Sequence, residues 1–555
     1  MPPPLPLTQT PAPALDWSRP GTPAASDFGD IYFSTDGGLE ETRTVFLKGC
    51  GLPEAWAKHP VFTIAELGFG SGLNFLATWQ MWQATAKSGQ SLHFVSIEKY
   101  PFDRAQLTQA LSAWPELAMF SEQLIAQWPG RVKGFHRLHF GSVSLTLIHE
   151  DVAHALDSVS GLAANAWFLD GFSPSKNADM WSDAVLEKVG ECSAPNAQLA
   201  TFSVAGSVRT ALKNAGFEVW KTEGFGRKRH RLEARYKGQS KTLPSPMEKA
   251  LIVGAGIAGR SLAQALTRRH IAFDIIDSRD HPAASGNPAA LVKPRFDLQD
   301  RPESRFFLSA YLYALRYYEA EATLETGVTQ IPKTPEQAKR YQKLAQQNPL
   351  GEDQLNWIDD HLDIVSARII DPAKTLSDIS VQHQTYDPDI AQKTYSHIFL
   401  AAGYGIRDLA PDLALRYSRG QLSWAETAIP QPIAYGGYAI PLGDNTLVGA
   451  THDRLDETDP FDLRAEDDVK NLAAYHAITG QNLTLSSQTS RASVRVTRQD
   501  TLPLMAKLND KIWVLTGLGS RGFSYAPLLA EALIAEVCGE VSPLERAVIA
   551  SFRKD

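Results

Sequence analysis

Two short glycine-rich stretches constrain the fold of this chain more than any other feature of its sequence. The first, AELGFGSGLNFL, spans 65–76, and the second, LIVGAGIAGRSL, spans 251–262. Each follows an apolar run and precedes a helical pattern, which is the order of the first unit of a doubly wound α/β fold. Because the two stretches differ in glycine spacing, we predict two α/β domains that bind two different cofactors.

The chain length and the spacing of its apolar runs agree with more than one domain. A chain of 555 residues is expected to form roughly two to four domains. Short apolar runs alternate with helical patterns from 61 to about 236, and the alternation restarts at 249 after a polar stretch with two prolines. We therefore predict a first domain over 1–240, with a flexible arm at about 1–20, a linker over 241–248, and a second domain over 249–555. An inserted α+β substrate subdomain is expected over about 300–480.

Composition excludes several classes of protein. No apolar run is long enough to span a bilayer, and the proline-rich N-terminus lacks the charged and apolar regions of a secretory signal. Cys50, Cys192 and Cys538 are far apart and none belongs to a CxxC pair, so neither a disulfide framework nor a metal site is expected. These features favour a cytoplasmic protein. The net charge of −8 does not suggest a nucleic-acid coat protein, but it leaves local basic surfaces possible.

The second glycine stretch has the spacing of a dinucleotide site. Gly254, Gly256 and Gly259 fit GxGxxG between a strand and a helix, where glycines permit a tight turn, approach to a pyrophosphate and close helix packing. The next strand pattern ends in Asp277, which is placed to bind ribose hydroxyls and disfavours NADP.

Three later segments favour FAD over NAD. They are a long loop, SGNPAALVKPRFD, an apolar strand that ends near Gly403, and a C-terminal strand, turn and helix with Gly519, Arg521 and Gly522 in the turn. With RGQLSW and RASVRVTRQDTLPLM, these segments resemble the D-amino acid oxidase and glycine oxidase family over about 249–540. The resemblance implies oxidation of a C–N bond beside a carboxylate, with an arginine that holds the carboxylate. Arg295, Arg495 and Arg521 are the candidates, and the sequence does not choose among them.

The first glycine stretch suits a methyl donor, which has no pyrophosphate. Acidic and polar residues stand at the ends of successive strand patterns, where ligands of open α/β sheets bind. The candidates for binding S-adenosylmethionine are Glu66, Gly68, Gly70, Gly72, Asn74, Glu98 and Asp151, and Asp170 is the catalytic candidate. Any one of these acids alone is better explained as a loop or cap residue. Their joint order resembles the class I, Rossmann-like methyltransferases.

The two halves together resemble one family, the bacterial bifunctional proteins of tRNA 5-methylaminomethyl-2-thiouridine biosynthesis. ELGFGSGLNFL, FLDGFSPSKNADMW, GFGRKRHRL and SGNPAALVKPR carry the resemblance, which covers nearly the whole chain. It implies a tRNA wobble uridine as substrate, FAD-dependent removal of its carboxymethyl group, and methylation of the amine that remains. Asp170 would orient this amine and help to take its proton. Phe172, Pro174 and Trp181 would form a wall for the uracil, and the competing interpretation is that they simply pack in the core.

Contact with RNA should require basic residues. GFGRKRHRLEARYK, 224–237, offers Arg227, Lys228, Arg229 and Arg231 as phosphate contacts. The competing interpretation is a solvated hairpin at a sheet edge, whose charges prevent edge pairing.

Two other functions agree with parts of the pattern. One is a flavin oxidase of glycine or sarcosine fused to an amine methyltransferase, and the other is an RNA-binding scaffold that has lost catalysis. The scaffold is disfavoured because both glycine turns keep their glycines and acids. A monomer would suffice for two steps, since both sites lie on one chain.

Overall fold

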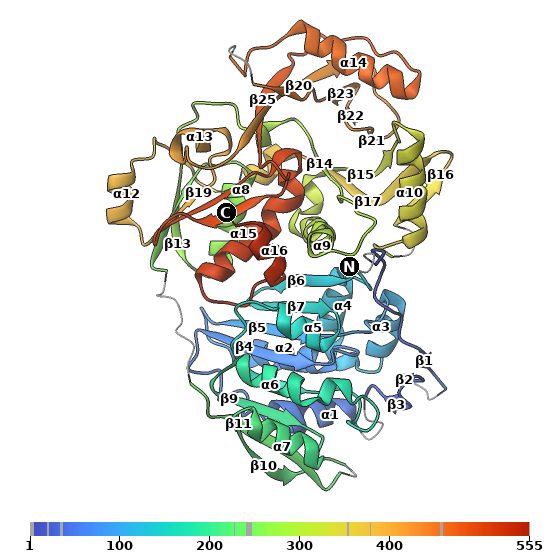
Figure 1. Ribbon diagram of the computed structural model, residues 1–555, viewed down its shortest axis with the longest axis vertical. Coiled ribbons are helices and arrows are strands. Elements are labelled where there is room, and N and C mark those ends of the chain that lie inside the picture. The colour runs from blue at the N-terminus through green and yellow to red at the C-terminus, as the bar shows by residue number, and fades with distance from the viewer. Residues whose placement is uncertain are drawn as a thin grey trace. The chain divides into compact units, whose positions relative to one another are not determined.

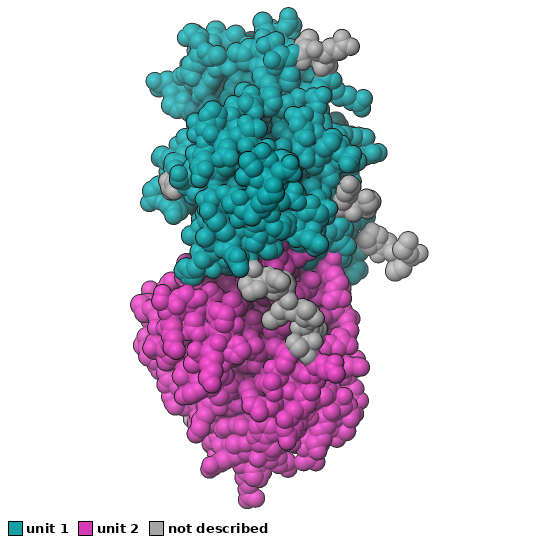
Figure 2. Space-filling view, turned by 90° about the vertical axis from the view of Figure 1, so that its left-hand side faces the viewer, with its two compact units in different colours: residues 1–8, 246–534, 547–555 teal, residues 9–245, 535–546 magenta. Residues whose placement is uncertain are grey.

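The computed structural model describes residues 5–18, 22–33, 37–226, 228–239, 247–351, 354–377, 379–455 and 459–553. The chain forms two compact units, which Figure 2 colours separately. The N-terminal unit contains 9–245 and 535–546, and the C-terminal unit contains 1–8, 246–534 and 547–555. The α/β fold class predicted from the sequence is confirmed. Most of the linker predicted over 241–248, namely 241–246, lies outside the described residues.

We predicted that one boundary near residue 245 divides the chain into two domains. The structure differs at both ends, because a segment from each end belongs to the other unit. Residues 535–546 belong to the N-terminal unit, where Val541 is buried in the hydrophobic core and its carbonyl oxygen accepts a 2.8 Å hydrogen bond from Arg137. Residues 1–8 belong to the C-terminal unit, where the amide of Leu7 donates to the carbonyl oxygen of Leu298 at 2.9 Å. These pairings join residues far apart in sequence, so no local pattern indicates them.

An eight-stranded sheet with the order β10-β11-β9-β8-β4-β5-β7-β6 organises the N-terminal unit (Figure 1). Its parallel part comprises β4 (Val61–Leu67), β5 (Ser91–Ile97), β7 (Val143–His149), β8 (Ala164–Leu169) and β9 (Ser193–Thr201). The antiparallel strands are β6 (Gly134–Phe140), β10 (Phe217–Glu223) and β11 (His230–Tyr236). Because β5 and β8 lie on opposite sides of β4, the strand order reverses there, which is where such sheets bind ligands.

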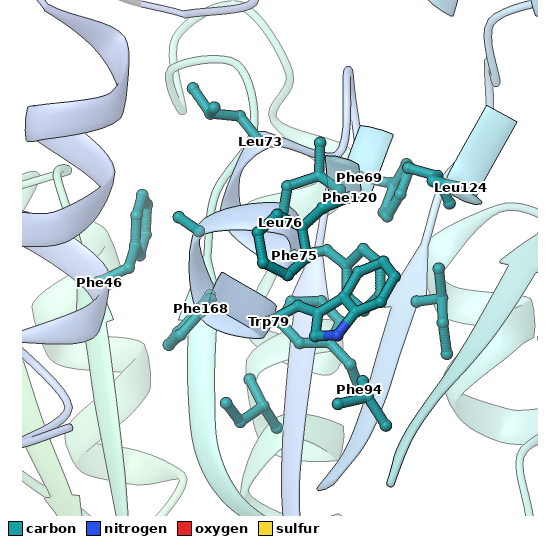
Figure 3. Close-up of a cluster of buried hydrophobic side chains, with 14 of the residues drawn as sticks. Phe46, Phe69, Leu73, Phe75, Leu76, Trp79, Phe94, Phe120, Leu124 and Phe168 are labelled. Atoms are coloured by element: carbon teal, nitrogen blue, oxygen red, sulfur yellow. The ribbon is translucent and has the colours of Figure 1, made fainter. Parts of the chain in front are cut away.

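Helices cover this sheet. They are α1 (Gly38–Thr42), α2 (Leu73–Thr85), α3 (Arg104–Leu111), α4 (Ala118–Gln127), α5 (Val152–Ser158), α6 (Asp183–Glu191) and α7 (Gly206–Asn214). Helix α2 buries Phe75 and Trp79 in an aromatic cluster (Figure 3), where Phe75 meets Phe94 of β5 edge-on at 5.3 Å between ring centroids. Because such a helix is held on several sides, its N-terminal turn is fixed in place. A short three-stranded sheet, β1 (Leu15–Asp16), β2 (Ala24–Ala25) and β3 (Asp30–Ile31), belongs to the same unit.

The C-terminal unit is built on two sheets. The first has the order β18-β13-β12-β19-β27-β26 and is parallel except for its last strand. Its strands are β12 (Lys249–Val253), β13 (Ala272–Asp277), β18 (Gln382–His383), β19 (His397–Leu400), β26 (Leu504–Lys507) and β27 (Ile512–Thr516). Helices α8 (Ile257–Arg268) and α15 (Gly522–Val537) begin at its glycine turns.

The second sheet is mixed, with the order β14-β17-β15-β21-β22-β23-β20-β24, β16 beside β17 and β25 beside β20. Its strands are β14 (Ala290–Val292), β15 (Thr323–Gln330), β16 (Leu355–Ile358), β17 (His361–Ile370), β20 (Arg416–Ala425), β21 (Ile433–Ala434), β22 (Tyr438–Leu442), β23 (Asn445–Gly449), β24 (Asp453–Arg454) and β25 (Arg491–Thr497). The remaining helices are α9 (Pro302–Tyr317), α10 (Pro335–Gln347), α11 (Pro372–Leu376), α12 (Pro388–Thr394), α13 (Ile406–Leu409), α14 (Ala465–Thr479) and α16 (Arg546–Ser551). Helix α14 packs against β20 and β23 (Figure 1).

Two kinds of feature are absent from the described residues. None of their helices combines the length and apolar character needed to cross a membrane. Nor do they contain a group of three or more His, Cys, Asp or Glu side chains that could hold a metal ion.

Candidate active sites

The first glycine turn connects β4 to α2 through three glycines with positive φ. Gly68, Gly70 and Gly72 have φ angles of 88°, 54° and 77°, which side chains of L-residues rarely adopt. A Cβ atom on Gly68 would also lie 2.5 Å from the carbonyl oxygen of Asp170. The turn therefore approaches the end of β8 closely, and its glycines are required by conformation and by space.

One amide side chain joins two acids behind this turn. Asn74, in the first turn of α2, donates to Glu66 at 2.9 Å and to Asp170 at 2.8 Å, and its oxygen accepts a 2.8 Å hydrogen bond from Thr42. Ser96 donates to the other oxygen of Glu66 at 2.6 Å. These bonds use both hydrogens of the Asn74 amide and fix its orientation. The structure thus brings together three of the predicted residues, Glu66, Asn74 and Asp170.

Burial changes the acidity of both carboxyl groups. It raises the pKa of Asp170 from 3.8 to about 7, against the opposing hydrogen bond from Asn74. It raises the pKa of Glu66 well above its usual value, although Ser96 and Asn74 oppose the change. Asp170 lines a cavity whereas Glu66 does not, so Asp170 is the acid that can meet a substrate.

The predicted ribose and adenine contacts face the same cavity, of about 550 Å³. Glu98 follows β5 and accepts from the amides of Gly70 at 2.9 Å and Tyr100 at 2.8 Å. Asp151 caps α5 by accepting from Ala153 at 3.0 Å. Among the described residues, seven acids line this cavity against two lysines: Asp30, Glu41, Glu98, Glu150, Asp151, Asp170 and Asp179. Such a lining suits a ligand with a positive charge, as a sulfonium methyl donor has.

Aromatic rings form part of the cavity wall. Phe172 lines it and stacks on Phe28, with 4.6 Å between ring centroids. The expected contributions of Pro174 and Trp181 are wrong, because neither lines the cavity. Trp181 is buried in the core, and its indole N–H donates to the carbonyl oxygen of Phe172 at 2.9 Å. Its packing supports the wall from behind.

The basic segment that precedes and begins β11 fits the predicted RNA contacts only in part. Arg231 is wrong as a phosphate contact, because its side chain is buried, pairs with Glu233 at 2.7 Å and donates to the carbonyl oxygen of Glu223. Lys228 lines the acidic cavity, pairs with Glu41 at 3.2 Å and lies 4.0 Å from the centre of the Phe202 ring. Arg229 is exposed, and Arg227 lies outside the described residues.

The second glycine turn solves a different steric problem. Gly254 has a φ of 105°, and a Cβ atom there would lie 2.5 Å from the carbonyl oxygen of Ala401. Gly256 caps α8, and a Cβ atom on Gly259 would overlap the carbonyl oxygen of Gly254. Asp277, at the end of β13, accepts from the amide of Ala255 at 2.7 Å. This cradle, closed to side chains and open to an anion at a helix N-terminus, fits the pyrophosphate of a dinucleotide.

A cavity of about 780 Å³ opens beside this turn. The predicted residues that line it are Gly254, Gly256, Asp277, Gly403, Arg495, Gly519, Arg521 and Gly522. Gly259 does not line it and serves the packing of α8. Of the three candidate arginines, Arg495 and Arg521 face the cavity. Arg295 does not, because its guanidinium lies over the Phe307 ring at 4.4 Å.

Lys293, within the segment SGNPAALVKPRFD, is a residue of the site that was not predicted from the sequence. Lys293 lines the dinucleotide cavity and donates to Gln330 at 2.8 Å. Burial, together with the smaller effect of the Arg521 charge, lowers its pKa to about 7. A lysine directly after an apolar strand pattern, within LVKPR, was the available signal, because a cation is seldom placed there without a buried partner or a ligand.

Folds and sites together define a class, a methyltransferase joined to a flavin-dependent oxidoreductase on one chain. A family of S-adenosyl-L-methionine-dependent methyltransferases matches residues 115–237, and a family of FAD dependent oxidoreductases matches residues 249–392 and 367–536. Both cofactors predicted from the sequence are thereby confirmed.

Three relatives share the full arrangement, and each is a tRNA 5-methylaminomethyl-2-thiouridine biosynthesis bifunctional protein MnmC. The protein of Maricaulis maris is 40% identical, with 96% of this chain and 93% of the relative covered. That of Caulobacter vibrioides is 41% identical, with 97% of each covered, and that of Thiobacillus denitrificans is 33% identical, also with 97% of each covered. The chain belongs to this MnmC family of bifunctional proteins.

Proposed function

We propose that this protein carries out two consecutive steps on a wobble uridine of tRNA. The first removes the carboxymethyl group from a 5-carboxymethylaminomethyl side chain, and the second methylates the primary amine that remains. The observation that carries the proposal is the pairing, on one chain of this family, of a dinucleotide cavity that contains arginine with an acid-lined methyl-donor cavity. When bound, FAD supplies a hydride acceptor and S-adenosylmethionine supplies a transferable methyl group.

The substrate of the first step is an N-substituted glycine, so it presents a carboxylate beside a secondary amine. Loss of a hydride from the glycine carbon and of the amine proton gives a C=N bond. Water then adds to that bond and divides the side chain into glyoxylate and a primary amine. We infer that Arg495 holds the carboxylate, because its side chain lines the cavity. Its guanidinium also donates a 3.2 Å hydrogen bond to the carbonyl oxygen of Thr451, which helps to orient it. Arg521 lines the same cavity and is the second candidate.

The second step requires a neutral amine, because an ammonium has no lone pair. Asp170 is placed to orient the amine and to accept its proton, since its carboxyl faces the cavity and is anchored by Asn74. A carboxyl pKa of about 7 suits this task better than an ordinary one, because a stronger base accepts the proton more readily. Phe172 and Phe28 offer apolar faces against which a uracil ring can pack.

The proposal places the protein in the cytoplasm, with tRNA as its partner. A monomer suffices, because one chain carries both cavities.

Nucleoside mass spectrometry tests the function directly. Transfer RNA from cells that lack this protein is incubated with the purified protein, with and without S-adenosylmethionine. We expect loss of the carboxymethyl group without the methyl donor and a gain of one methyl group with it. If the uridine is unchanged while free glycine or sarcosine is oxidised, the small-molecule oxidase replaces this proposal.

A further inference from the structure

A second cavity of the C-terminal unit is lined by arginines in excess of what the proposed chemistry needs. It has a volume of about 1370 Å³ and is here called the arginine basin. Its arginines are Arg295, Arg407, Arg416, Arg454, Arg498 and Arg521. Among the described residues, no aspartate, glutamate or lysine lines it. The described charged residues that line the basin are thus all positive, although the net charge of the chain is −8.

Most of these arginines have no carboxylate partner among the residues that the structure describes. Within the described part of the chain, Arg295, Arg407, Arg416 and Arg521 form no ion pair with a carboxylate, whereas Arg498 pairs with Asp500 at 2.9 Å. Arg407 donates to the hydroxyl of Tyr404 at 3.1 Å. Clustered like charges without counter-charges repel each other, and an anionic ligand relieves that repulsion.

The pairing of three strands sets several of these groups on one face. Ser418 of β20 pairs with Arg454 of β24 and with Arg495 of β25, so the three side chains form a row across the sheet. Arg416, two residues before Ser418, lies on the same face. Because Arg495 lines the dinucleotide cavity and the other members line the basin, one sheet face passes from one cavity to the other.

The two cavities adjoin each other. Six residues line both: Tyr404, His452, Leu518, Gly519, Ser520 and Arg521. Tyr404 stands edge-on to Tyr417 of the basin, with 5.7 Å between ring centroids and an interplanar angle of 89°. Both tyrosines are half-buried, so each still presents some surface to a ligand.

A small substrate does not explain this set of cations. One carboxylate is satisfied by one or two arginines, and the pyrophosphate cradle lies at the N-terminus of α8, outside the basin. Several unpaired arginines together with tyrosine rings are what proteins use to hold single-stranded nucleic acid, through phosphates and stacked bases. We propose that the arginine basin binds the phosphates of the tRNA loop nucleotides that flank the modified uridine, with Tyr417 as a stacking surface. This inference rests on the proposed function and assigns the substrate-binding surface of the oxidation step.

The test compares two double variants, each of which removes two positive charges. R407Q/R416Q alters the basin, and K339Q/K393Q alters exposed lysines that line neither cavity. We expect R407Q/R416Q to weaken tRNA binding about tenfold or more and to lower the slope of log affinity against log salt by ~1.4, which is two contacts at ~0.7 each. Its flavin absorbance and its oxidation of a free N-alkylglycine should stay within twofold of wild type. K339Q/K393Q should change none of these quantities by more than twofold.

A second pair of variants tests stacking separately. Y417L should weaken tRNA binding ~5-fold or more without changing the salt slope, while Y417F should bind as wild type does. Thermal unfolding and flavin content check that each variant is folded.

The outcomes separate the inference from the function on which it rests. If wild type converts tRNA and R407Q/R416Q binds and converts it as K339Q/K393Q does, the basin does not hold RNA and the inference is overturned. If R407Q/R416Q loses oxidation of the free N-alkylglycine to the same extent as that of tRNA, the basin serves the small substrate and the inference is also overturned. If wild type itself leaves the tRNA unchanged, the proposed function fails first.

Discussion

The two glycine turns of this protein use the same position in a fold for different physical reasons. All three glycines of the first turn have positive φ, whereas Gly254 alone does so in the second. Gly259 has an ordinary conformation, and its lack of a side chain is needed because the carbonyl oxygen of Gly254 lies against it. Both turns need glycine for close approach, but positive φ is required at all three positions of the first turn and at Gly254 alone in the second.

The cavities beside the turns also differ in charge. Of the residues that the structure describes, seven acids and two lysines line the methyl-donor cavity, whereas three acids, two lysines and two arginines line the dinucleotide cavity. The difference follows the ligands, since a sulfonium is a cation and a pyrophosphate is an anion. Each cavity contains one group whose pKa is shifted to about 7, mainly by burial. The pKa of Asp170 is raised to this value, and that of Lys293 is lowered to it.

Breaking each turn should weaken the binding of one cofactor and leave that of the other unchanged. Gly259→Ala places a Cβ atom on the carbonyl oxygen of Gly254, and Gly68→Ala places one 2.5 Å from that of Asp170 at an unfavourable φ. We expect on the order of 100-fold weaker FAD binding in the first variant and a similar loss of S-adenosylmethionine binding in the second. Flavin absorbance and calorimetric titration measure the two affinities.

Gly480→Ala is the matched control for these variants. Gly480 has a φ of 70° but open space around it, so both cofactors should be retained. Loss of both cofactors from either turn variant would contradict the independence of the two sites.

Asp170→Asn should lower methyl transfer by ~10²–10⁴-fold and leave oxidation intact. Because the pKa of Asp170 is raised to about 7, its carboxyl is protonated below that pH, and the wild-type rate of methylation should rise as pH increases through 7. The variant should lose the part of this rise that Asp170 causes. Rates with tRNA that already carries the primary amine, measured from pH 5.5 to 9, check this. An unchanged rate would remove Asp170 from the chemistry.

The sequence did not distinguish Arg295 from Arg495 as the residue that holds the carboxylate. Substitutions of the two should have different effects on the oxidation of a free N-alkylglycine. Arg495→Met should reduce kcat/KM about 10- to 100-fold, the size expected for a charged hydrogen bond of ~1.5–3 kcal/mol. Arg295→Met should stay within about twofold, because Arg295 lines the basin and not the dinucleotide cavity. The reverse order of effects would exchange their roles.

The smallest predicted effects concern stability and have opposite signs of pH dependence. The pKa of Asp170 is raised, so burial of its carboxylate destabilises the folded protein. This destabilisation grows as pH rises from about 4 to 7 and is complete above pH 7. Lys293 has a lowered pKa, so its burial is destabilising fully below pH 7 and progressively less as pH rises toward 10.5.

Thermal unfolding of the cofactor-free protein measures this difference. Asp170→Asn should raise the unfolding temperature by a few degrees at pH 8.5 and less at pH 5.5, while Lys293→Met should do so at pH 6 and less at pH 9.5. Equal shifts at both pH values would mean that the substitutions act through packing and not through charge.

The sequence predicted the parts of the sites that are local. Gly68, Asp277 and Glu98 sit at strand ends, and a strand end is recognisable from the few residues around it. Arg231 was misjudged, because a basic run gives no sign that one of its members turns inward to meet Glu233. The choice between Arg295 and Arg495 also depended on the cavity that each one lines, since Arg295 lies in the loop after β14 and Arg495 lies in β25.

The arginine basin was beyond any local pattern. Arg295, Arg416 and Arg521 are separated by more than a hundred residues from one another and meet only because strands and turns of the C-terminal unit converge. The terminal segments at 1–8 and 535–546 are comparable cases, since their partners are distant in the chain.

The acidic lining of the methyl-donor cavity also bears on exchange of ligands. A wall of carboxylates distinguishes two molecules of nearly the same shape when one of them carries an additional positive charge. A sulfonium methyl donor carries that charge, and the thioether left after its methyl group has gone does not. The same carboxylates that attract the fresh donor therefore retain the spent one less strongly.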